Sequence, residues 1–406
     1  MTGLLQVYLN DTPVGTLTLL SSGNTFFAFD EHYLKAADQP TLSQSFFRPS
    51  GELIPESKAS AGKLPPFFAN LLPEGHMRLH LAERGNIKPS HEFRLIELLG
   101  QDLPGAIIVT PMDGSPANLA IPEATQPDQG IQPLRFSLAG VQLKFSAIAE
   151  RRGGLTIPAS GIGGDWIVKL PARNYTHVPE NEYAIMDLAS RIGIPVPEIR
   201  LIPLTDIDNL PEMGILAGKQ ALAVKRFDRM LSGKRIHIED FAQVYNIVPE
   251  KKYEGVSFAG IANMVWTLTG ETGLTDFIRR LTFTILAGNG DMHLKNWSFI
   301  YEDGETPVLA PAYDLLSTIP YIPDDGLALK LSDTKDMRVI GIEHFRKLVK
   351  KAQVPEHLVL QTVRDTMDLT FSAWTESNRH YDLPEEIRIG IQKHMEVVRL
   401  RNSSAG

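Results

Sequence analysis

The residues Gly288-Asn289-Gly290-Asp291-Met292-His293-Leu294-Lys295-Asn296 follow an apolar helical pattern that runs through Phe277, Leu281 and Ile285. Glycine commonly ends a helix, because it adopts the left-handed backbone conformation without strain. We therefore expect the helix to end at the two glycines and Asp291 to lie on an irregular loop. The interpretation of the whole chain depends on which other residues reach this loop.

Two short strand patterns follow the loop, around Phe299 and around Leu309, with a turn between them. Antiparallel strands bring the chain back to its starting end. Asn296, immediately before the first strand, and Asp314, immediately after the second, are therefore predicted to be neighbours in space. Such an oxygen-rich pair beside the carboxylate of Asp291 suits Mg²⁺ and phosphate oxygens.

Asp291 and Asn296 are five positions apart, which is the spacing of the protein-kinase catalytic loop. In that loop the Asp accepts the proton of the substrate hydroxyl and the Asn binds a metal ion. Asp314 would then have the role of the second metal-binding Asp. Asp and Asn after a helix are more often turn or capping residues, so the kinase interpretation needs all three residues and an upstream lysine.

Lys169 is that lysine, within the apolar strand pattern Trp166-Ile167-Val168-Lys169-Leu170. A lysine in a strand usually faces solvent, and the alternative is an ion pair inside a cleft. Glu182 lies thirteen positions further on in a helical pattern, which makes a lysine–glutamate pair of the kinase type the functional interpretation. A charge in the first turn of a helix is its ordinary alternative.

Two further segments are candidates for nucleotide contacts. Small residues at 137–142, before Lys144, predict a turn between strands whose backbone N–H groups approach phosphates, although a plain tight turn with an exposed lysine is the alternative. The segment 224–229 leaves a strand where the helical region begins, which is where a two-lobed phosphotransferase holds adenine. A charged surface linker is the alternative there.

The composition is that of an ordinary globular protein, with 406 residues, a formal net charge of −8, 43% hydrophobic residues and no cysteine. Without cysteine there is no disulfide framework, thiolate nucleophile or Cys-ligated metal, and a reducing cytoplasm is the expected location. No signal peptide or membrane-spanning stretch is indicated. The acidic balance argues against nucleic-acid binding as the main role.

The pattern of elements divides the chain into four parts. An α+β unit is predicted for 1–112, a Pro-rich linker or loop for 113–133, a β-rich lobe for 134–228 and a helical lobe for 229–406. The last helix is expected to begin with Asp382 as its cap. His76 and His80 have the spacing of a helical metal pair, but the absence of a third ligand favours ordinary helix histidines.

Taken together, these segments resemble the HipA family of bacterial serine/threonine kinase toxins. The resemblance rests on the following stretches: Ser137-Leu138-Ala139-Gly140-Val141-Gln142-Leu143-Lys144, Ile167-Val168-Lys169-Leu170-Pro171, Asn181-Glu182-Tyr183, Ala223-Val224-Lys225-Arg226-Phe227-Asp228-Arg229, Asp291-Met292-His293-Leu294-Lys295-Asn296, Tyr313-Asp314, Asn70-Leu71-Leu72-Pro73-Glu74 and Gly105-Ala106. It covers nearly the whole chain.

The resemblance implies an α+β, two-lobed protein-kinase-like fold, with an α+β N-terminal subdomain, a β-rich nucleotide lobe and an all-helical C-terminal lobe. It also implies ATP and Mg²⁺ as cofactors and a protein serine or threonine as substrate. Asp291 would be the catalytic base and Asn296 and Asp314 the metal ligands. The implied nucleotide-binding residues are Lys169, Ala139, Gly140, Val141, Gln142, Lys144, Arg226, Phe227, His293 and Lys295. Ser137 would be an autophosphorylated serine whose phosphate repels those of ATP and switches the kinase off.

The resemblance further implies a helix-turn-helix antitoxin of the HipB type, which would contact operator DNA, and an aminoacyl-tRNA synthetase as a substrate. Leu143, Met292 and Lys225 depart from the residues common in the family, which affects loop geometry and the adenine side of the site. Two alternatives remain. One is a small-molecule phosphotransferase, which uses the same Asp, Asn and Asp, and the other is a kinase-shaped corepressor that acts with an antitoxin.

Overall fold

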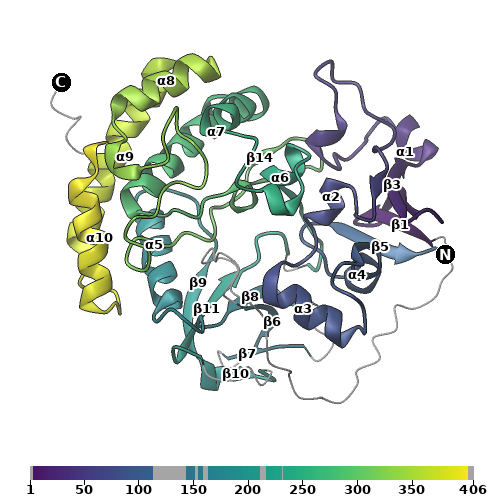
Figure 1. The fold of residues 1–406 in the computed structure, drawn as a ribbon, viewed down its shortest axis with the longest axis horizontal. Coiled ribbons are helices and arrows are strands. Elements are labelled where there is room, and N and C mark those ends of the chain that lie inside the picture. The colour runs from purple at the N-terminus through teal and green to yellow at the C-terminus, as the bar shows by residue number, and fades with distance from the viewer. Residues whose placement is uncertain are drawn as a thin grey trace.

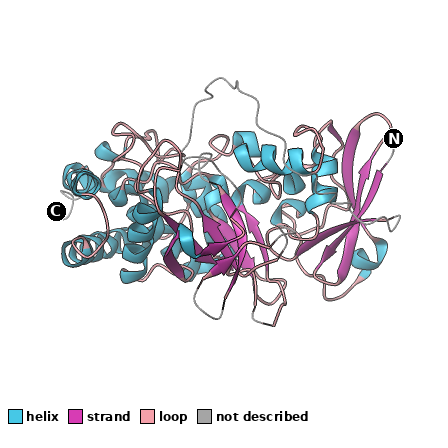
Figure 2. Ribbon diagram, turned by 90° about the horizontal axis from the view of Figure 1, so that it is seen from below, coloured by secondary structure: helices cyan, strands magenta, loops and turns pink. Residues whose placement is uncertain are grey.

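The computed structural model describes residues 3–112, 143–150, 154–158, 163–210, 216–230 and 232–400. The expected Pro-rich linker at 113–133 lies outside these residues. The described residues form three sheets and a group of helices, and Figure 1 shows the second sheet near the middle of the longest axis. The N-terminal sheet lies at one end and α8, α9 and α10 lie at the other (Figures 1 and 2).

The N-terminal sheet has the strand order β4-β3-β2-β1-β5 and is antiparallel throughout. Its strands are β1 Gly3–Leu9, β2 Thr12–Leu19, β3 Asn24–Phe29, β4 Ser60–Ala61 and β5 Ile107–Pro111. The helices α1 Glu31–Lys35, α2 Pro66–Ala69, α3 Gly75–Arg84 and α4 Glu92–Leu99 belong to the same part. These strands and helices form an α+β unit, and alternating or helical apolar residues such as Val7, Leu17 and Ile96 fill its core.

The second sheet has the order β10-β7-β6-β8-β11-β9. Its strands are β6 Lys144–Ala149, β7 Leu155–Thr156, β8 Trp166–Lys169, β9 Ile199–Pro203, β10 Ile207–Asp208 and β11 Gln220–Lys225. Helix α5, Val178–Arg191, packs on β11 and β9 through Ile185 and Leu188. It begins at Val178, so Glu182 lies beyond its first turn, and the alternative of a first-turn charge is wrong.

The remaining chain is mainly helical, with α6 Phe241–Val244, α7 Phe258–Ala287, α8 Ile342–Ala352, α9 Glu356–Ser377 and α10 Glu385–Val397. A third sheet, β12 His237–Asp240, β13 Ser298–Tyr301 and β14 Val308–Leu309, lies among these helices. An all-helical lobe is therefore too simple a description, because β12 and the predicted hairpin pair with each other. Within the described residues, no helix combines the length and apolar character that crossing a membrane requires.

Two local predictions need correction. Asp382 does not cap the last helix: Pro384 occupies the N-cap position of α10, and no side-chain cap is formed there. Asp314 does not directly follow the second strand of the hairpin, because β14 already ends at Leu309. Single-residue spacing at element ends is poorly determined by apolar periodicity alone.

Separate hydrophobic cores accompany the sheets. One spans Leu5 to Val109, another Leu143 to Ala223, and the largest Ile185 to Leu400. The second core and the largest core overlap in sequence, because α5 packs into the largest core. The boundaries near 112 and 228 stay predictions, because the largest core contains residues on both sides of residue 228.

Glu239 joins the N-terminal part to the third sheet. Its buried carboxylate accepts hydrogen bonds from Ser43 Oγ at 2.5 Å, from the Gln44 backbone N–H at 3.0 Å and from the Tyr301 hydroxyl. Burial raises the pKa of Glu239 to about 7, although these donors favour the charged form. The carboxyl group that connects these two parts therefore titrates near neutral pH.

We expect Glu239→Gln to flatten part of the pH dependence of stability. A carboxyl group whose pKa is raised by folding stabilises the fold at low pH and loses that contribution as the pH rises from the unfolded value of 4.5 to about 7. The unfolding free energy of the wild type minus that of Glu239→Gln should fall by about 1.4 kcal/mol per pH unit in this window. Urea unfolding at pH 5, 6 and 7 measures this difference, and a constant difference would contradict the assignment.

Candidate active site

Lys169 lies at the end of β8, directly opposite Lys144 on the antiparallel neighbour β6. Like charges on opposed positions repel each other, so this arrangement needs nearby carboxylates. Asp314 lies between the two amines, accepting from Lys144 Nζ at 2.8 Å and from Lys169 Nζ. Glu182 on α5 also accepts from Lys169 Nζ. Lys169 is thus paired inside the protein, not solvent-facing, and its side chain is 4% exposed.

The electrostatics of this cluster follow from burial and pairing. Burial by itself would lower the pKa of Lys169, but the charges of Asp314 and Glu182 raise it above its ordinary value. Burial would raise the pKa of Asp314, yet Lys144 and Lys169 hold it well below its usual range. Lys169 is therefore cationic and Asp314 anionic at neutral pH.

Asp291 lies on the loop after α7, as predicted. Gly288 ends the helix with φ of 70°, and its backbone N–H bonds to the carbonyl oxygen of Thr284. Asp291 is buried, and its Oδ1 accepts a 2.6 Å hydrogen bond from the Tyr253 hydroxyl. The short 3₁₀-helix Leu294–Asn296 then places the Asn296 amide, whose Nδ2 donates to the Asp291 carbonyl oxygen at 2.8 Å. That bond directs the Asn296 Oδ1 away from the carbonyl.

Asn289 and Thr318 connect the Asp291 loop to the segment that follows Asp314. Asn289 Oδ1 accepts from the Asp291 backbone N–H at 3.0 Å, and its Nδ2 reaches the Asp314 carbonyl oxygen at 3.5 Å. Thr318 Oγ1 accepts from the Gly290 N–H at 2.9 Å. Asp314 itself has φ of 54°, a conformation that Asp tolerates better than most residues. The two loops are thus joined by several hydrogen bonds.

Asn181 is a site residue to which the sequence predicted no role. Its Oδ1 accepts from the Ser317 N–H at 3.1 Å and its Nδ2 donates to the Ser317 carbonyl oxygen at 2.9 Å, both fully buried. It precedes Glu182, so neighbouring residues of α5 hold Lys169 and the chain just after Asp314. The only sequence signal was an Asn next to the helix glutamate.

His293 and Lys295, two of the predicted nucleotide-binding residues, have different surroundings. His293 is 2% exposed, and neither of its ring nitrogens has a hydrogen-bond partner among the described residues. Burial and the nearby Lys252 and Lys295 lower its pKa, so the ring is neutral. Lys295 Nζ donates to the Asn70 carbonyl oxygen at 2.7 Å and lies 3.2 Å from an Asp240 carboxylate oxygen, which directs its amine toward the N-terminal part.

Arg226 and Phe227, predicted to flank adenine, come directly after β11. The Arg226 guanidinium is buried and pairs with Asp228 at 2.8 Å and with Asp102 at 3.3 Å. The alternative of a charged surface linker is therefore wrong for Arg226. The Phe227 ring lies 5.9 Å from that of Tyr313, centroid to centroid, beside Asp314.

Five predicted residues, Ser137, Ala139, Gly140, Val141 and Gln142, lie outside the described residues. Of the predicted phosphate-binding segment the structure therefore places Lys144, and Leu143 before it. The Leu143 carbonyl accepts from the Leu170 N–H at 2.9 Å. The segment thus enters β6 beside the end of β8, next to Lys169.

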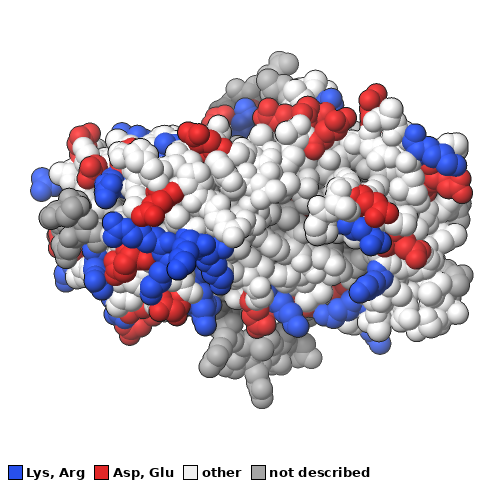
Figure 3. Space-filling view, turned by 90° about the horizontal axis from the view of Figure 1, so that it is seen from above, with Lys and Arg blue, Asp and Glu red and all other residues white. Residues whose placement is uncertain are grey.

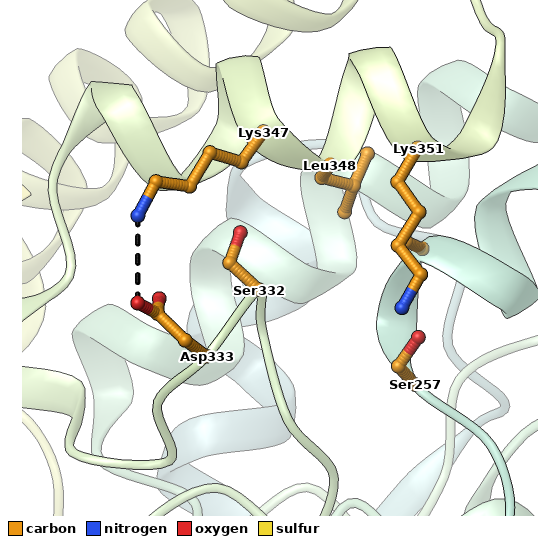
Figure 4. Close-up of a pocket in the computed structure, with 7 residues that line it drawn as sticks. Ser257, Ser332, Asp333, Lys347, Leu348 and Lys351 are labelled. Atoms are coloured by element: carbon orange, nitrogen blue, oxygen red, sulfur yellow. Dashed lines mark hydrogen bonds and ion pairs between the residues drawn. The ribbon is translucent and has the colours of Figure 1, made fainter.

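A surface pocket elsewhere contains none of the predicted site residues. Ser257, Ala259, Ser332, Asp333, Lys347, Leu348 and Lys351 line it, and Lys347 reaches Asp333 at 3.5 Å (Figure 4). Figure 3 shows Lys and Arg side chains gathered on part of the face seen from above. Lys347, Lys350 and Lys351 of α8 are exposed. These lysines give α8 a solvated, cationic face.

A buried lysine–glutamate pair in the β-rich lobe, an Asp of the helical lobe on the same lysine and an Asp-x-x-x-x-Asn loop are the features of a kinase-like fold. The comparisons agree with this class. Residues 5–110 match the model of the HipA N-terminal domain, and residues 136–374 match that of the HipA-like C-terminal domain. The chain therefore belongs to the HipA family of kinases.

Relatives cover nearly the whole chain. "Putative kinase Y4dM" of Sinorhizobium fredii is 47% identical over 403 residues, which are 98% of this chain and 97% of the relative. "Serine/threonine-protein kinase toxin HipA" of Shewanella oneidensis is 26% identical over 399 residues, which are 88% of this chain and 86% of the relative. A structure of the Shewanella oneidensis HipA, HipB and operator DNA complex is similar with a TM-score of 0.76. The match covers 97% of this chain and 95% of that one at 22% identity, and shows the same fold.

We expect Asp314→Asn to lower the unfolding free energy by about 3 kcal/mol, because it leaves two opposed lysines with Glu182 as their nearest carboxylate. Adding Lys144→Met should recover part of this loss, since it removes one of the two cations. Urea unfolding of the single and double variants measures both effects.

Lys225→Met is the control, because Lys225 lies on β11 in an exposed ion pair with Glu198 at 3.4 Å. It should change the unfolding free energy by less than about 0.5 kcal/mol. If Lys144→Met gives no recovery in the Asp314→Asn background, repulsion between the lysines is not the cause of the loss.

Proposed function

We propose that this protein is an ATP- and Mg²⁺-dependent protein serine/threonine kinase that acts in the cytoplasm as the toxin of a toxin–antitoxin pair. The observation that carries this proposal is the amine of Lys169, which contacts Glu182 and Asp314 together. An active kinase requires a lysine–glutamate pair of this kind together with an Asp that binds the metal ion, and Asp314 would be that Asp.

The donor set fits the nucleotide and its metal. Among the described residues no group of three or more His, Asp or Glu side chains could form a complete metal site. Mg²⁺ in kinases does not need one, because it takes one or two protein oxygens together with phosphate oxygens and water. Asp314 and Asn296 would supply those protein oxygens, and Lys169 and Lys144 the charge for the phosphates.

ATP would supply the γ-phosphoryl group, and Mg²⁺ would neutralise the charge that develops on the phosphate oxygens. Asp291 would accept the proton of the serine or threonine hydroxyl. The hydroxyl oxygen would bond to the γ-phosphorus while the bond from that phosphorus to the bridging oxygen breaks, and that oxygen would leave with ADP. Tyr253 holds Oδ1 of Asp291 and Asn296 holds its carbonyl oxygen, so the carboxylate is oriented before substrate binds. Rate enhancement would come mainly from this positioning and from charge neutralisation.

The regulatory and cellular parts of the proposal rest on family likeness. Ser137 is proposed as an inhibitory autophosphorylation site, and Ala139, Gly140, Val141 and Gln142 as phosphate-loop residues. His293, Lys295, Arg226 and Phe227 are proposed to line the nucleotide site. A HipB-type antitoxin is the proposed partner, since a similar structure is a complex of HipA with HipB and operator DNA. An aminoacyl-tRNA synthetase is the proposed substrate.

We expect the wild type, incubated with ATP and Mg²⁺ alone, to gain one phosphate on Ser137, while Asp291→Asn gains none. The variant should unfold at the same urea concentration as the wild type, because the amide keeps the hydrogen-bond acceptor for Tyr253. Intact-mass and peptide mass spectrometry of a sample shown to be unmodified at the start measure the transfer.

The other outcomes point to the alternatives. Phosphate on a metabolite and on no protein would support a small-molecule phosphotransferase. ATP binding without turnover, together with operator binding that needs the antitoxin, would support a corepressor. Equal phosphate incorporation by Asp291→Asn would remove Asp291 from the role of catalytic base.

A further inference from the structure

The motif Asn70-Leu71-Leu72-Pro73-Glu74 follows α2 in the N-terminal part, and the proposed function gives it no role. Asn70 is buried, and its Nδ2 donates to the carbonyl oxygen of Ile247 at 2.7 Å and to that of Pro66 at 2.9 Å. The motif is therefore fixed against the segment that leads into α7. Its polar groups face the catalytic loop from outside the two lobes.

Lys295 is the point where the motif meets that loop, one position before Asn296. Its Nζ donates to the Asn70 carbonyl oxygen at 2.7 Å and to Asn70 Oδ1 at 3.2 Å, and lies 3.5 Å from Glu74 Oε1. Asp240 Oδ2 is 3.2 Å away on another side. The side chain of Lys295 is 15% exposed, so the amine is held by protein groups on several sides.

Glu74 also holds the other flank of the loop. Its Oε2 accepts from Lys252 Nζ at 2.8 Å. The carbonyl oxygen of Lys252 accepts from the Leu294 N–H at 3.2 Å, and the next residue, Tyr253, bonds Asp291 through its hydroxyl. The Glu74 carboxylate thus contacts both Lys295, which precedes Asn296, and Lys252. Lys252 in turn precedes Tyr253, the hydrogen-bond partner of Asp291.

The charges explain why a carboxylate is needed at this place. Lys252 and Lys295 are both largely buried cations that share Glu74. Burial would raise the pKa of Glu74, but Lys295 and Lys252 lower it, so the group is anionic at neutral pH. Without that charge the amines of Lys252 and Lys295 would repel each other across the loop. Asp240 would then remain as a carboxylate partner of Lys295 but not of Lys252.

We propose that Asn70 and Glu74 are positioning residues for the phosphotransfer reaction, through which the N-terminal part fixes the loop that carries Asp291 and Asn296. They act through Lys295, Lys252 and Tyr253 and do not touch the reacting atoms. The inference rests on the proposed roles of Asp291 and Asn296. It makes the N-terminal part a component of the catalytic machinery rather than a separate binding module.

A matched control exists at the same interface. Lys63 in the N-terminal part pairs with Glu250 at 2.6 Å, with the two side chains 52% and 54% exposed. This pair joins the same two parts of the chain but has no bond to residues 288–296 among the described residues. Lys63→Gln therefore removes an ion pair between the parts and leaves the loop unchanged.

The first experiment compares hydrogen–deuterium exchange of the full chain without nucleotide in the wild type, Glu74→Gln and Lys63→Gln. We expect faster exchange of the peptides that cover 288–296 and 252–254 in Glu74→Gln alone. Equal exchange in all three chains would overturn the proposal. Hydrogen–deuterium exchange does not depend on activity. It therefore reports whether Glu74 fixes the loop even if the proposed reaction is wrong.

The second experiment measures initial rates of phosphate incorporation into Ser137 against ATP concentration for the same chains and for Glu74→Asp, and kcat here denotes the limiting rate constant of this single incorporation. We expect Glu74→Gln to lower kcat roughly tenfold to a hundredfold, with KM for ATP changed by less than about twofold, because a misplaced catalytic group costs rate rather than nucleotide binding. Glu74→Asp should recover part of kcat, and Lys63→Gln should equal the wild type.

The outcomes separate the inference from the function on which it rests. Loss of activity in Asp291→Asn but wild-type kcat in Glu74→Gln would overturn the inference alone. An equal loss in Lys63→Gln and Glu74→Gln would also overturn it, since general weakening of the interface would then be the cause. Full activity in Asp291→Asn would overturn the proposed function, whatever the exchange data show.

Discussion

The structure around the candidate active site depends on one electrostatic constraint. Lys144 and Lys169 occupy opposed positions on β6 and β8, so two amines face the same small volume. Glu182 reaches this volume from α5, and Asp314 reaches it from the chain beyond the third sheet. Elements that are far apart in sequence are therefore held at fixed places because two cations need two anions.

Charged groups and amides have different tasks in this site. The ion pairs bring β6, β8, α5 and the Asp314 segment together, but a Coulomb interaction has little directional preference. Asn181 and Asn289 add direction, because a carboxamide donates and accepts in one plane and thereby fixes a backbone. Both amides are buried, where an unmade hydrogen bond is costly. This combination gives the Asp291 loop and the Asp314 segment a defined mutual arrangement.

The sequence predicted the parts of the molecule that depend on local pattern. The pattern of elements predicted an α+β unit at the N-terminus, and the glycines predicted the end of α7. The comparison with kinase motifs singled out Glu182 and Asp314, and both contact Lys169. The contacts of Glu239 with Ser43 and of Lys295 with Asn70 were not predictable, because each joins residues more than a hundred positions apart and involves polar groups without periodicity. The cap of α10 was missed because several neighbouring residues suit a helix start equally well.

The connection that leaves β11 is held to the N-terminal part by ionic contacts. Arg229 pairs with Asp102 at 3.0 Å and with Asp228 at 2.7 Å, and the Gly105 N–H donates to Asp228 at 2.8 Å. Deleting the N-terminal part would leave Arg226 and Arg229 without Asp102 and would expose the residues that it covers. The two family segments of this chain are therefore not interchangeable modules, and we expect recombination during evolution to have kept or lost them as a pair.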